Sequence, residues 1–262
     1  MKKRTILLIG LAAALIGAWG CGTKTLPSAA ADAVGMSEER LSRVHEVIKE
    51  AIARKELPGA VLLVARKGKV VLREAYGESQ WVPEHKPMAA GMIFDLASVT
   101  KPVATATSIL LLAERGRISL WDRVKMHVPE FAPYVDEWGQ KGEDARIWNL
   151  LTHTSGLPPY TDAAEAGKKL GSPCATEALV KYIAILKKTN PPGAEFHYSC
   201  LGYITMAHIV KKVSGLSIDA FAEQHIFKPL KMYHTLYKPA SKYPGLSVPT
   251  QVVDGKPLIG VV

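Results

Sequence analysis

The sequence predicts a mixed α/β (α+β) fold that begins with antiparallel strands and continues mostly as helices. Residues 60–65 and 70–76 are two apolar runs around a short turn containing Lys67 and Gly68, which is typical of a β-hairpin. Residues 98–114 form a nearly apolar stretch with the length of a buried helix. Further apolar residues recur at helical spacing over 176–188, 201–214 and 218–225.

Before the hairpin, residues 37–55 predict an amphipathic helix, with Ser37 as its N-cap and acidic residues in its first turn. One face of this helix carries apolar residues at three- and four-residue steps, so we expect that face to be buried. These residues are Leu41, Val44, Val47, Ile48 and Ile52. Pro58-Gly59 ends the helix, and residues 77–95 predict a loop-rich crossing into the helical region.

The helix over 98–114 is expected to lie buried at the centre of the helical region, because apolar residues cover nearly all of its faces. Pro102 falls within its first turns, where a missing N–H does little harm, and Gly116 ends it. Residues 147–151 predict a further short helix. Beyond residue 233 the pattern dissolves into prolines, glycines and short apolar runs.

The first residues are typical of an export signal. Basic residues at positions 2–4 precede an apolar stretch, residues 5–20, which is too short to span a membrane. Cys21 follows in a context similar to a bacterial lipoprotein cleavage site, and the alternative is cleavage near residues 29–31. We therefore expect residues 1–21 to be a signal peptide, with Cys21 lipidated. The protein would be exported to the periplasm or cell envelope, and would contact the membrane only through the signal or lipid anchor.

Residues 22–36 are rich in Ala, Ser, Thr and Pro, and predict a flexible tether. Residues 37–262 are then expected to form the folded part of the chain. The net charge is +9, and the basic residues, such as Lys187-Lys188, are scattered without interleaved aromatic residues. This distribution argues against a nucleic-acid partner and suits a solvated surface facing anionic envelope polymers.

Ser98 and Lys101 are the first candidates for chemistry. They stand at i and i+3, so their side chains project from the same helix face. A lysine that is close and partly desolvated can take the proton of a serine hydroxyl, and a helix N-terminus supplies N–H groups where an oxyanion would form. A Ser-x-x-Lys pattern alone is weak, because a capping serine followed by a surface lysine has the same spacing.

Two later motifs follow in a fixed order. Residues 150–158 read Leu-Leu-Thr-His-Thr-Ser-Gly-Leu-Pro, and residues 196–203 contain Tyr198-Ser199-Cys200. With Ser98-x-x-Lys101 before them, and with residues 227–232 after them, the chain resembles the serine β-lactamase-like family. That family includes class C β-lactamases, D-alanyl-D-alanine carboxypeptidases and related esterases. The resemblance runs from about residue 36 to residue 232.

The resemblance implies a β-lactamase/transpeptidase-like fold, with an antiparallel sheet beside a mostly helical subdomain and the site between them. Ser98 would be acylated by a D-alanyl peptide, a β-lactam or a small ester, and the acyl-enzyme would then be hydrolysed. Lys101 would lower the cost of deprotonating Ser98, and Tyr198 would relay the proton. Lysine and tyrosine buried together titrate as a coupled unit, so which of them is the base stays open. No cofactor is expected.

Cysteine stands at position 200, where the family usually has asparagine in its Tyr-x-Asn motif. Cys200 would therefore line the substrate site, and three interpretations are open: a small filler with fewer hydrogen bonds to substrate, a change of preference towards esters, or a catalytic thiol. A disulfide between Cys174 and Cys200 is also open, because an exported chain can oxidise such a pair.

The resemblance assigns His153 a bracing role near the site. The histidine spacings match no metal-binding motif, and Gly-x-Ser-x-Gly is absent, which argues against a catalytic metal and an α/β-hydrolase elbow. No Lys-Thr-Gly or His-x-Gly follows Tyr198, although the family completes its pocket with one of these. We therefore expect a C-terminally truncated domain. The alternative function is a catalytically incompetent envelope-anchored fragment or binding module.

Overall fold

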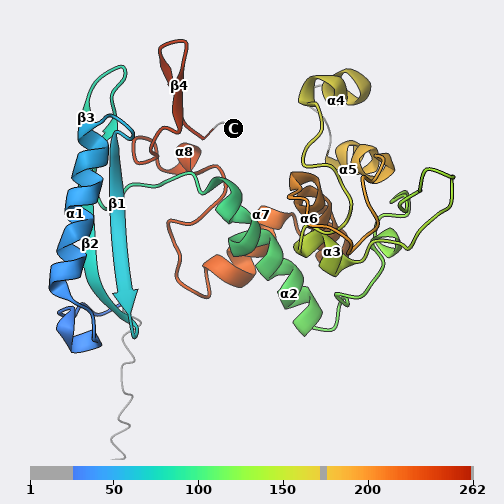
Figure 1. The fold of residues 1–262 in the computed structure, drawn as a ribbon, viewed down its shortest axis with the longest axis horizontal. Coiled ribbons are helices and arrows are strands. Elements are labelled where there is room, and N and C mark those ends of the chain that lie inside the picture. The colour runs from blue at the N-terminus through green and yellow to red at the C-terminus, as the bar shows by residue number, and fades with distance from the viewer. Residues whose placement is uncertain (1–25, 172–175, 261–262) are drawn as a thin grey trace, which may run out of the picture.

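A computed structural model of the chain describes residues 26–171 and 176–260 (Figure 1). A small antiparallel sheet with one covering helix, α1, lies at one end of the molecule, and helices α3 to α6 gather at the other end. Helices α2 and α7 lie between them, beside the C-terminal segment. This arrangement matches the expected fold, a sheet region beside a mostly helical region.

The sheet contains β1 (Gly59–Arg66), β2 (Lys69–Gln80) and β3 (Lys86–Pro87), in the order β1-β2-β3 with antiparallel pairing. Arg66 pairs with Lys69, which leaves Lys67 and Gly68 as a two-residue turn. Both turn residues have positive φ, 50° and 70°, as a type I′ hairpin turn requires. The predicted hairpin is confirmed, and β2 continues four residues further than expected.

The two edges of the hairpin differ. Val70 of β2 donates its N–H to the Pro27 carbonyl and accepts the N–H of Ala29, so this segment pairs with the edge of β2 that faces away from β1. Within the described residues β1 has β2 as its one strand neighbour, and Leu63 on β1 is 54% exposed.

Residues 22–36 were predicted to be a flexible tether, but from Pro27 onward this segment is structured. Besides the bridge to β2, this segment forms a 3-10 turn, η1 (Asp32–Val34), and the side chain of Val34 is buried. Its alanine and valine side chains find apolar contacts beside the hairpin, which composition alone does not indicate. The predicted signal peptide at residues 1–21, with Cys21, lies outside the described residues, as does Cys174.

Helix α1 (Glu38–Ala53) begins as predicted, because Ser37 Oγ accepts a hydrogen bond from the backbone N–H of Arg40. Its apolar face is less buried than expected. None of its residues is fully buried, and Val47 is 63% exposed. A sheet of three strands, one of them only two residues long, is too narrow to cover a helix of 16 residues.

The predicted helix over 98–114 is interrupted. A 3-10 turn η2 (Ala97–Val99) leads into a π-helical turn η3 (Lys101–Ala106), and regular helix α2 extends over Thr107–Glu114. Pro102 in the π-helical turn has no N–H to donate, and its carbonyl accepts a hydrogen bond from Thr107 Oγ1 at 2.8 Å. Gly116, with a φ of 64°, follows the end of the helix as predicted. Leu110 is exposed, so the helix buries one face rather than all of them.

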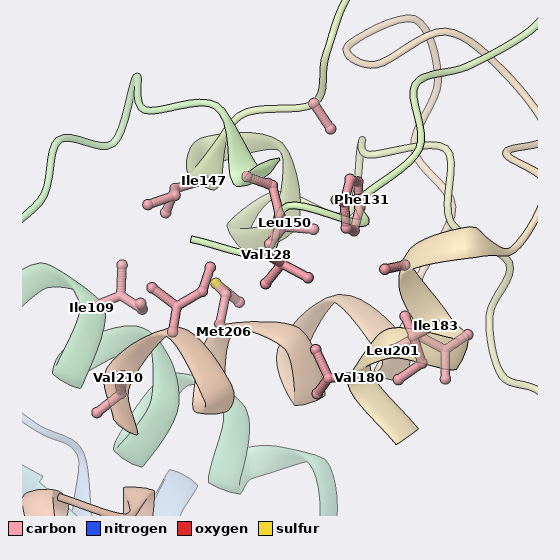
Figure 2. Packing of buried hydrophobic residues seen from close by; sticks show 14 of the residues in the cluster. Ile109, Val128, Phe131, Ile147, Leu150, Val180, Ile183, Leu201, Met206 and Val210 are labelled. Carbon is pink, nitrogen blue, oxygen red and sulfur yellow. The ribbon is translucent and has the colours of Figure 1, made fainter. Parts of the chain in front are cut away.

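The main hydrophobic core lies in the helical region (Figure 2). It contains side chains of α2, α3, α5, α6 and of the loop that follows the turn η4 (Val124–Met126). The labelled residues are Ile109, Val128, Phe131, Ile147, Leu150, Val180, Ile183, Leu201, Met206 and Val210. A second, smaller cluster joins Ala104 to Phe227 and fixes the start of α2 against the following helices.

The predicted helices of this region are confirmed with small shifts of their ends. The observed elements are α3 (Ile147–Leu151), α5 (Thr176–Ile185), α6 (Cys200–Ser214), α7 (Ile218–Ala222) and the π-helical turn η5 (Glu223–Phe227). Helix α4 (Ala163–Leu170) was not predicted.

The segment after residue 233 also carries structure that its sequence pattern does not reveal. It contains α8 (Pro239–Lys242) and a separate hairpin of β4 (Gln251–Val253) and β5 (Lys256–Leu258). Ile93 and Ser247 form a parallel bridge, so this segment lies against the chain that leads to Ser98. Among the residues described, we find no helix with the length and apolar character needed to cross a membrane.

Candidate active site

Ser98 is exposed and lies at the start of the helical segment that runs through η2, η3 and α2. It is the middle residue of the turn η2, where N–H groups have no acceptor within the helix. Ala97, directly before it, adopts a left-handed conformation with a φ of 42°, and its N–H donates to Asp95 Oδ1 at 2.7 Å. Alanine in this conformation is strained, and such strain is concentrated at functional sites. Sequence reasoning missed this feature, because nothing in Asp95-Leu96-Ala97 requires it.

Lys101 lies one turn further along, and its side chain is half-buried. Its Nζ donates a hydrogen bond to Ser98 Oγ at 2.9 Å. The spacing of three residues therefore brings the two side chains together as predicted.

Tyr198 comes from the loop before α6 and reaches the same place. Lys101 Nζ lies 5.1 Å from the centre of the tyrosine ring. Hydrogen bonding to Lys101, and then to Ser98, lowers the pKa of the Tyr198 phenol from its ordinary value, because both stabilise the phenolate. Tyr198, which is distant in the sequence, therefore converges with Ser98 and Lys101.

The charge of Lys101 differs from the sequence-based hypothesis of a desolvated lysine that takes a proton. Burial opposes the charged form, but hydrogen bonding to Tyr198 and electrostatic interaction with Cys200 and Tyr198 outweigh it and raise the lysine pKa. A raised pKa keeps Lys101 as an ammonium ion at neutral pH. The lowered pKa makes the Tyr198 phenol easier to deprotonate than an ordinary tyrosine.

The loop that carries Tyr198 is fixed by backbone contacts with the 153–159 segment. His197 N–H donates to the His153 carbonyl at 2.9 Å, and Cys200 N–H donates to the Pro159 carbonyl at 2.8 Å. Ser199, which is buried, donates from Oγ to the Pro158 carbonyl at 2.7 Å. The two motifs that followed Ser98-x-x-Lys101 in sequence are thus one structural unit.

His153 contributes its side chain as well as its carbonyl. Its Nδ1 accepts the Ser199 N–H at 3.0 Å, and its ring lies 4.4 Å from the Tyr198 ring and 5.1 Å from the Tyr203 ring. Burial, and then the nearby charge of Lys101, lower the His153 pKa below its ordinary value. A neutral imidazole whose Nδ1 accepts the Ser199 N–H packs against the Tyr198 ring, which agrees with the bracing role expected for His153.

Cys200 is a free, half-buried thiol at the first position of α6, and it interacts with Lys101. In the part of the chain that the structure describes, no three histidine, cysteine, aspartate or glutamate side chains gather as a metal site would require.

A cavity of about 530 Å³ lies next to this site. It is lined by the segment that leads to Ser98, by the start of the α2 helix and by the C-terminal segment around Tyr237 and Val248. Ser98, Lys101 and Tyr198 do not line it. The cavity therefore neighbours the reacting groups without containing them.

Comparison with known proteins places this chain in one family. The profile of the family described as Beta-lactamase matches residues 44–244. The N-acetylmuramyl-L-alanine amidase of Bacillus subtilis is 31% identical over 221 residues, which are 81% of this chain and 49% of that protein. A putative D-alanyl-D-alanine carboxypeptidase of Escherichia coli is 27% identical over 92% of this chain and 57% of its own length.

Among solved structures, EstCE1, a hydrolase with promiscuous acyltransferase activity, superimposes with a TM-score of 0.70 at 25% identity, over 84% of this chain and 58% of its own. The protein is a member of the Beta-lactamase family of serine hydrolases and has its β-lactamase/transpeptidase-like fold. The chain spans about half the length of the curated relatives it matches.

Proposed function

We propose that this protein is an exported serine hydrolase that forms an acyl-enzyme on Ser98. The single observation that carries the proposal is the convergence of Ser98, Lys101 and Tyr198, with Lys101 Nζ 2.9 Å from Ser98 Oγ. Export rests on the pattern of residues 1–21 and envelope contact on a signal or lipid at Cys21. The hydrolase domain would occupy the chain from about residue 37 to residue 262.

In the acylation step, Ser98 Oγ attacks the substrate carbonyl carbon while Tyr198 accepts the hydroxyl proton. Lys101 stays an ammonium ion and stabilises both the phenolate and the developing alkoxide. Collapse of the tetrahedral intermediate breaks the carbon–nitrogen or carbon–oxygen bond, and Tyr198 returns the proton to the leaving group. Water, deprotonated by the same phenolate, then cleaves the ester and regenerates Ser98.

The negative oxygen of the intermediate needs hydrogen-bond donors. The Ser98 backbone N–H is one candidate, since it belongs to the first turn of the helix. The positive end of the same helix favours the negative charge.

The substrate class follows from the relatives. An amidase and a putative D-alanyl-D-alanine carboxypeptidase are among the similar proteins, and EstCE1 is a hydrolase with acyltransferase activity. All of these activities transfer or cleave an acyl group. We therefore propose a D-alanyl peptide of peptidoglycan type, a β-lactam or a small ester as the acyl donor, without a cofactor or a nucleic-acid partner.

A second candidate function is that of a catalytically incompetent, envelope-anchored module of the same family. The observation that favours it is the edge of β1, which has no second strand neighbour among the residues that the structure describes. A strand beside the site normally supplies part of the pocket in the resembling family. Such a module would bind its ligand without acylating Ser98.

The test is incubation of the folded chain with a fluorescent penicillin and, separately, with a nitrophenyl ester, followed by mass spectrometry of the peptide that contains Ser98. The expected result is an adduct on Ser98 that is lost in Ser98→Ala. The control for folding is a circular dichroism spectrum and melting curve for each sample. A folded chain that acquires no adduct from either reagent contradicts the hydrolase proposal and favours the binding module.

A further inference from the structure

The cavity beside the Ser98 segment has the size and the walls of a small-molecule site. Its volume is about 530 Å³, and such sites usually measure roughly 300–1,000 Å³. Strand β2, the chain that leads to η2, the turn η3 and residues 234–239 and 247–248 all contribute to its lining. Apolar side chains of this lining include Phe94, Leu96, Val103, Phe227, Leu236 and Val248. A ligand with an apolar body therefore fits these walls.

Two segments that are far apart in the sequence form one wall of the cavity. The N–H of Ile93 donates to the Leu246 carbonyl at 2.9 Å, and the Ile93 carbonyl accepts the Val248 N–H at 2.8 Å. Ile93 is buried, so these two hydrogen bonds are shielded from water. This wall is therefore fixed before any ligand binds.

Ser247 adds an unsatisfied hydroxyl to this wall. It lines the cavity, and its Oγ is buried without a hydrogen-bond partner among the described residues. A buried hydroxyl without a partner destabilises a fold, and native structures contain few of them. A polar group inside the cavity would supply the missing hydrogen bond.

The charged side chains of the lining favour an anion. Arg73 and Lys238 are positive, whereas Asp95 is the one acidic residue among the described residues that line the cavity. Asp95 Oδ1 already accepts the Ala97 N–H at 2.7 Å. Arg73 Nη2 donates to the Ala90 carbonyl at 3.0 Å, and a guanidinium has further N–H donors whose geometry matches a carboxylate.

Arg73 and Ser247 belong to the same wall. Arg73 is bonded to Ala90, and Ser247 pairs with Ile93, three residues later in the chain. A carboxylate has two acceptor oxygens, so one carboxylate can accept hydrogen bonds from both side chains.

We propose that the cavity is a second ligand site, which binds a monocarboxylic acid with an apolar body and holds its carboxylate with Arg73 and Ser247. The apolar body lies against the apolar lining, where removal from water supplies much of the affinity. Ser98, Lys101 and Tyr198 do not line the cavity. The proposal therefore goes beyond the proposed function and does not depend on acylation of Ser98.

The test is isothermal titration calorimetry with decanoate, kept below the concentration at which it forms micelles, at about pH 7, where a carboxylic acid is ionised. We expect saturable binding, and weaker binding of decanamide, which has the same carbon chain without the charge. Arg73→Met should raise the Kd for decanoate about tenfold and leave that for decanamide unchanged, because only the charged ligand loses a charge-assisted hydrogen bond. Ser247→Ala should raise the Kd for decanoate about fivefold. Arg43→Met, a matched loss of an arginine on α1 outside the cavity lining, should change neither Kd.

Ser98→Ala separates this site from the acylation site, and this variant should bind decanoate as the unaltered protein does. Loss of binding in Ser98→Ala would place the ligand in the acylation site and overturn the proposal. Decanoate that does not bind saturably also overturns it, as does an equal Kd in the unaltered protein and in Arg73→Met. If circular dichroism shows that Arg73→Met is not folded, Arg73→Gln removes the charge in its place. If decanoate binds as expected but penicillin does not label Ser98, the proposed function fails and this second site stands.

Discussion

Lys188 is buried and forms no ion pair with a carboxylate of the described residues. Its side chain is 2% exposed, and Nζ donates to the carbonyls of Ala184 and Leu186 at 2.7 and 3.0 Å. Nζ also lies 4.3 Å from the centre of the Phe131 ring. Burial lowers the Lys188 pKa from 10.5 to about 8. We expect Lys188→Met to change the pH dependence of stability.

The magnitude follows from linkage. The folded-state pKa of Lys188 lies below the unfolded value, so the folded chain releases this proton first and its stability rises with pH between about 8 and 10.5. A fall from 10.5 to about 8, at about 1.4 kcal/mol per pKa unit, makes the full rise about 3 kcal/mol. At pH 7 the methionine variant avoids the cost of burying a charge but leaves two carbonyls without their donor, so the two effects largely offset each other.

The assay is urea unfolding of both proteins at pH 7, 8, 9 and 10. The free energy of unfolding of the unaltered protein, minus that of Lys188→Met, should increase by about 2 kcal/mol or more over this range. Lys181→Met is the matched control, since Lys181 lies on α5, the helix that precedes Lys188, with its side chain 66% exposed. That control should show no such trend. A difference that stays constant from pH 7 to pH 10 would refute the buried, uncompensated charge of Lys188.

Three further predictions concern the site. Gly156→Ala should lower the free energy of unfolding, measured in urea, by more than about 2 kcal/mol, because Gly156 has a φ of 75° and a new Cβ would lie 2.2 Å from the Asn190 carbonyl oxygen. An unchanged urea midpoint would contradict this close packing. His153 has a lowered pKa, so its stabilising contact with Ser199 is complete above about pH 6.5 and is lost as the pH falls through the folded-state pKa. The urea midpoint should therefore fall from pH 7 to pH 5, and it should fall less in His153→Gln. Tyr198→Phe should keep the ring on His153 and slow acylation of Ser98 by about 10²–10⁴-fold in a stopped-flow assay with a nitrophenyl ester, whereas an unaltered rate would exclude the phenol as base.

The parts of the site that depend on local chain geometry were predictable from the sequence. Ser98 and Lys101 meet because they are three residues apart at a helix start, and the hairpin turn at Lys67-Gly68 follows from its residue types. The resemblance to the serine β-lactamase-like family supplied Tyr198, which no local pattern would have selected.

The remaining features depend on contacts between distant segments. The pKa of Lys101 also depends on Tyr198 and Cys200, about a hundred residues later in the chain, which counteract the effect of burial, so a local argument about desolvation does not contain these contributions. In the sequence, Lys188 resembles a surface residue because it is one of two adjacent lysines. In the structure its side chain is buried, where it contacts a carbonyl near the end of α5 and the Phe131 ring. The hairpin of β4 and β5 is too short for its apolar residues to form a recognisable period.

The reacting groups belong to the helical side of the molecule. Ser98 and Lys101 precede α2, and Tyr198 precedes α6, and both helices bury side chains in the same core (Figure 2). The distance between the lysine and the tyrosine is therefore fixed by that core and not by the sheet. The open edge of β1 lies on the other side of α2 from α3 to α6 (Figure 1).

The helical side and the sheet side of the molecule therefore meet different requirements of acyl transfer. Forming the serine nucleophile requires only the helical side, whereas holding the substrate and stabilising its oxyanion uses donors from both sides of the carbonyl. One missing oxyanion donor costs about 2.7–4 kcal/mol in the transition state. A strained β-lactam ring is the more reactive acyl donor and should depend less on a second oxyanion donor, beside the Ser98 N–H, than an unstrained peptide does. We therefore expect labelling of Ser98 by penicillin to be detectable even where release of D-alanine from a peptide is not, and the reverse order would contradict a nucleophile assembled by the helices alone.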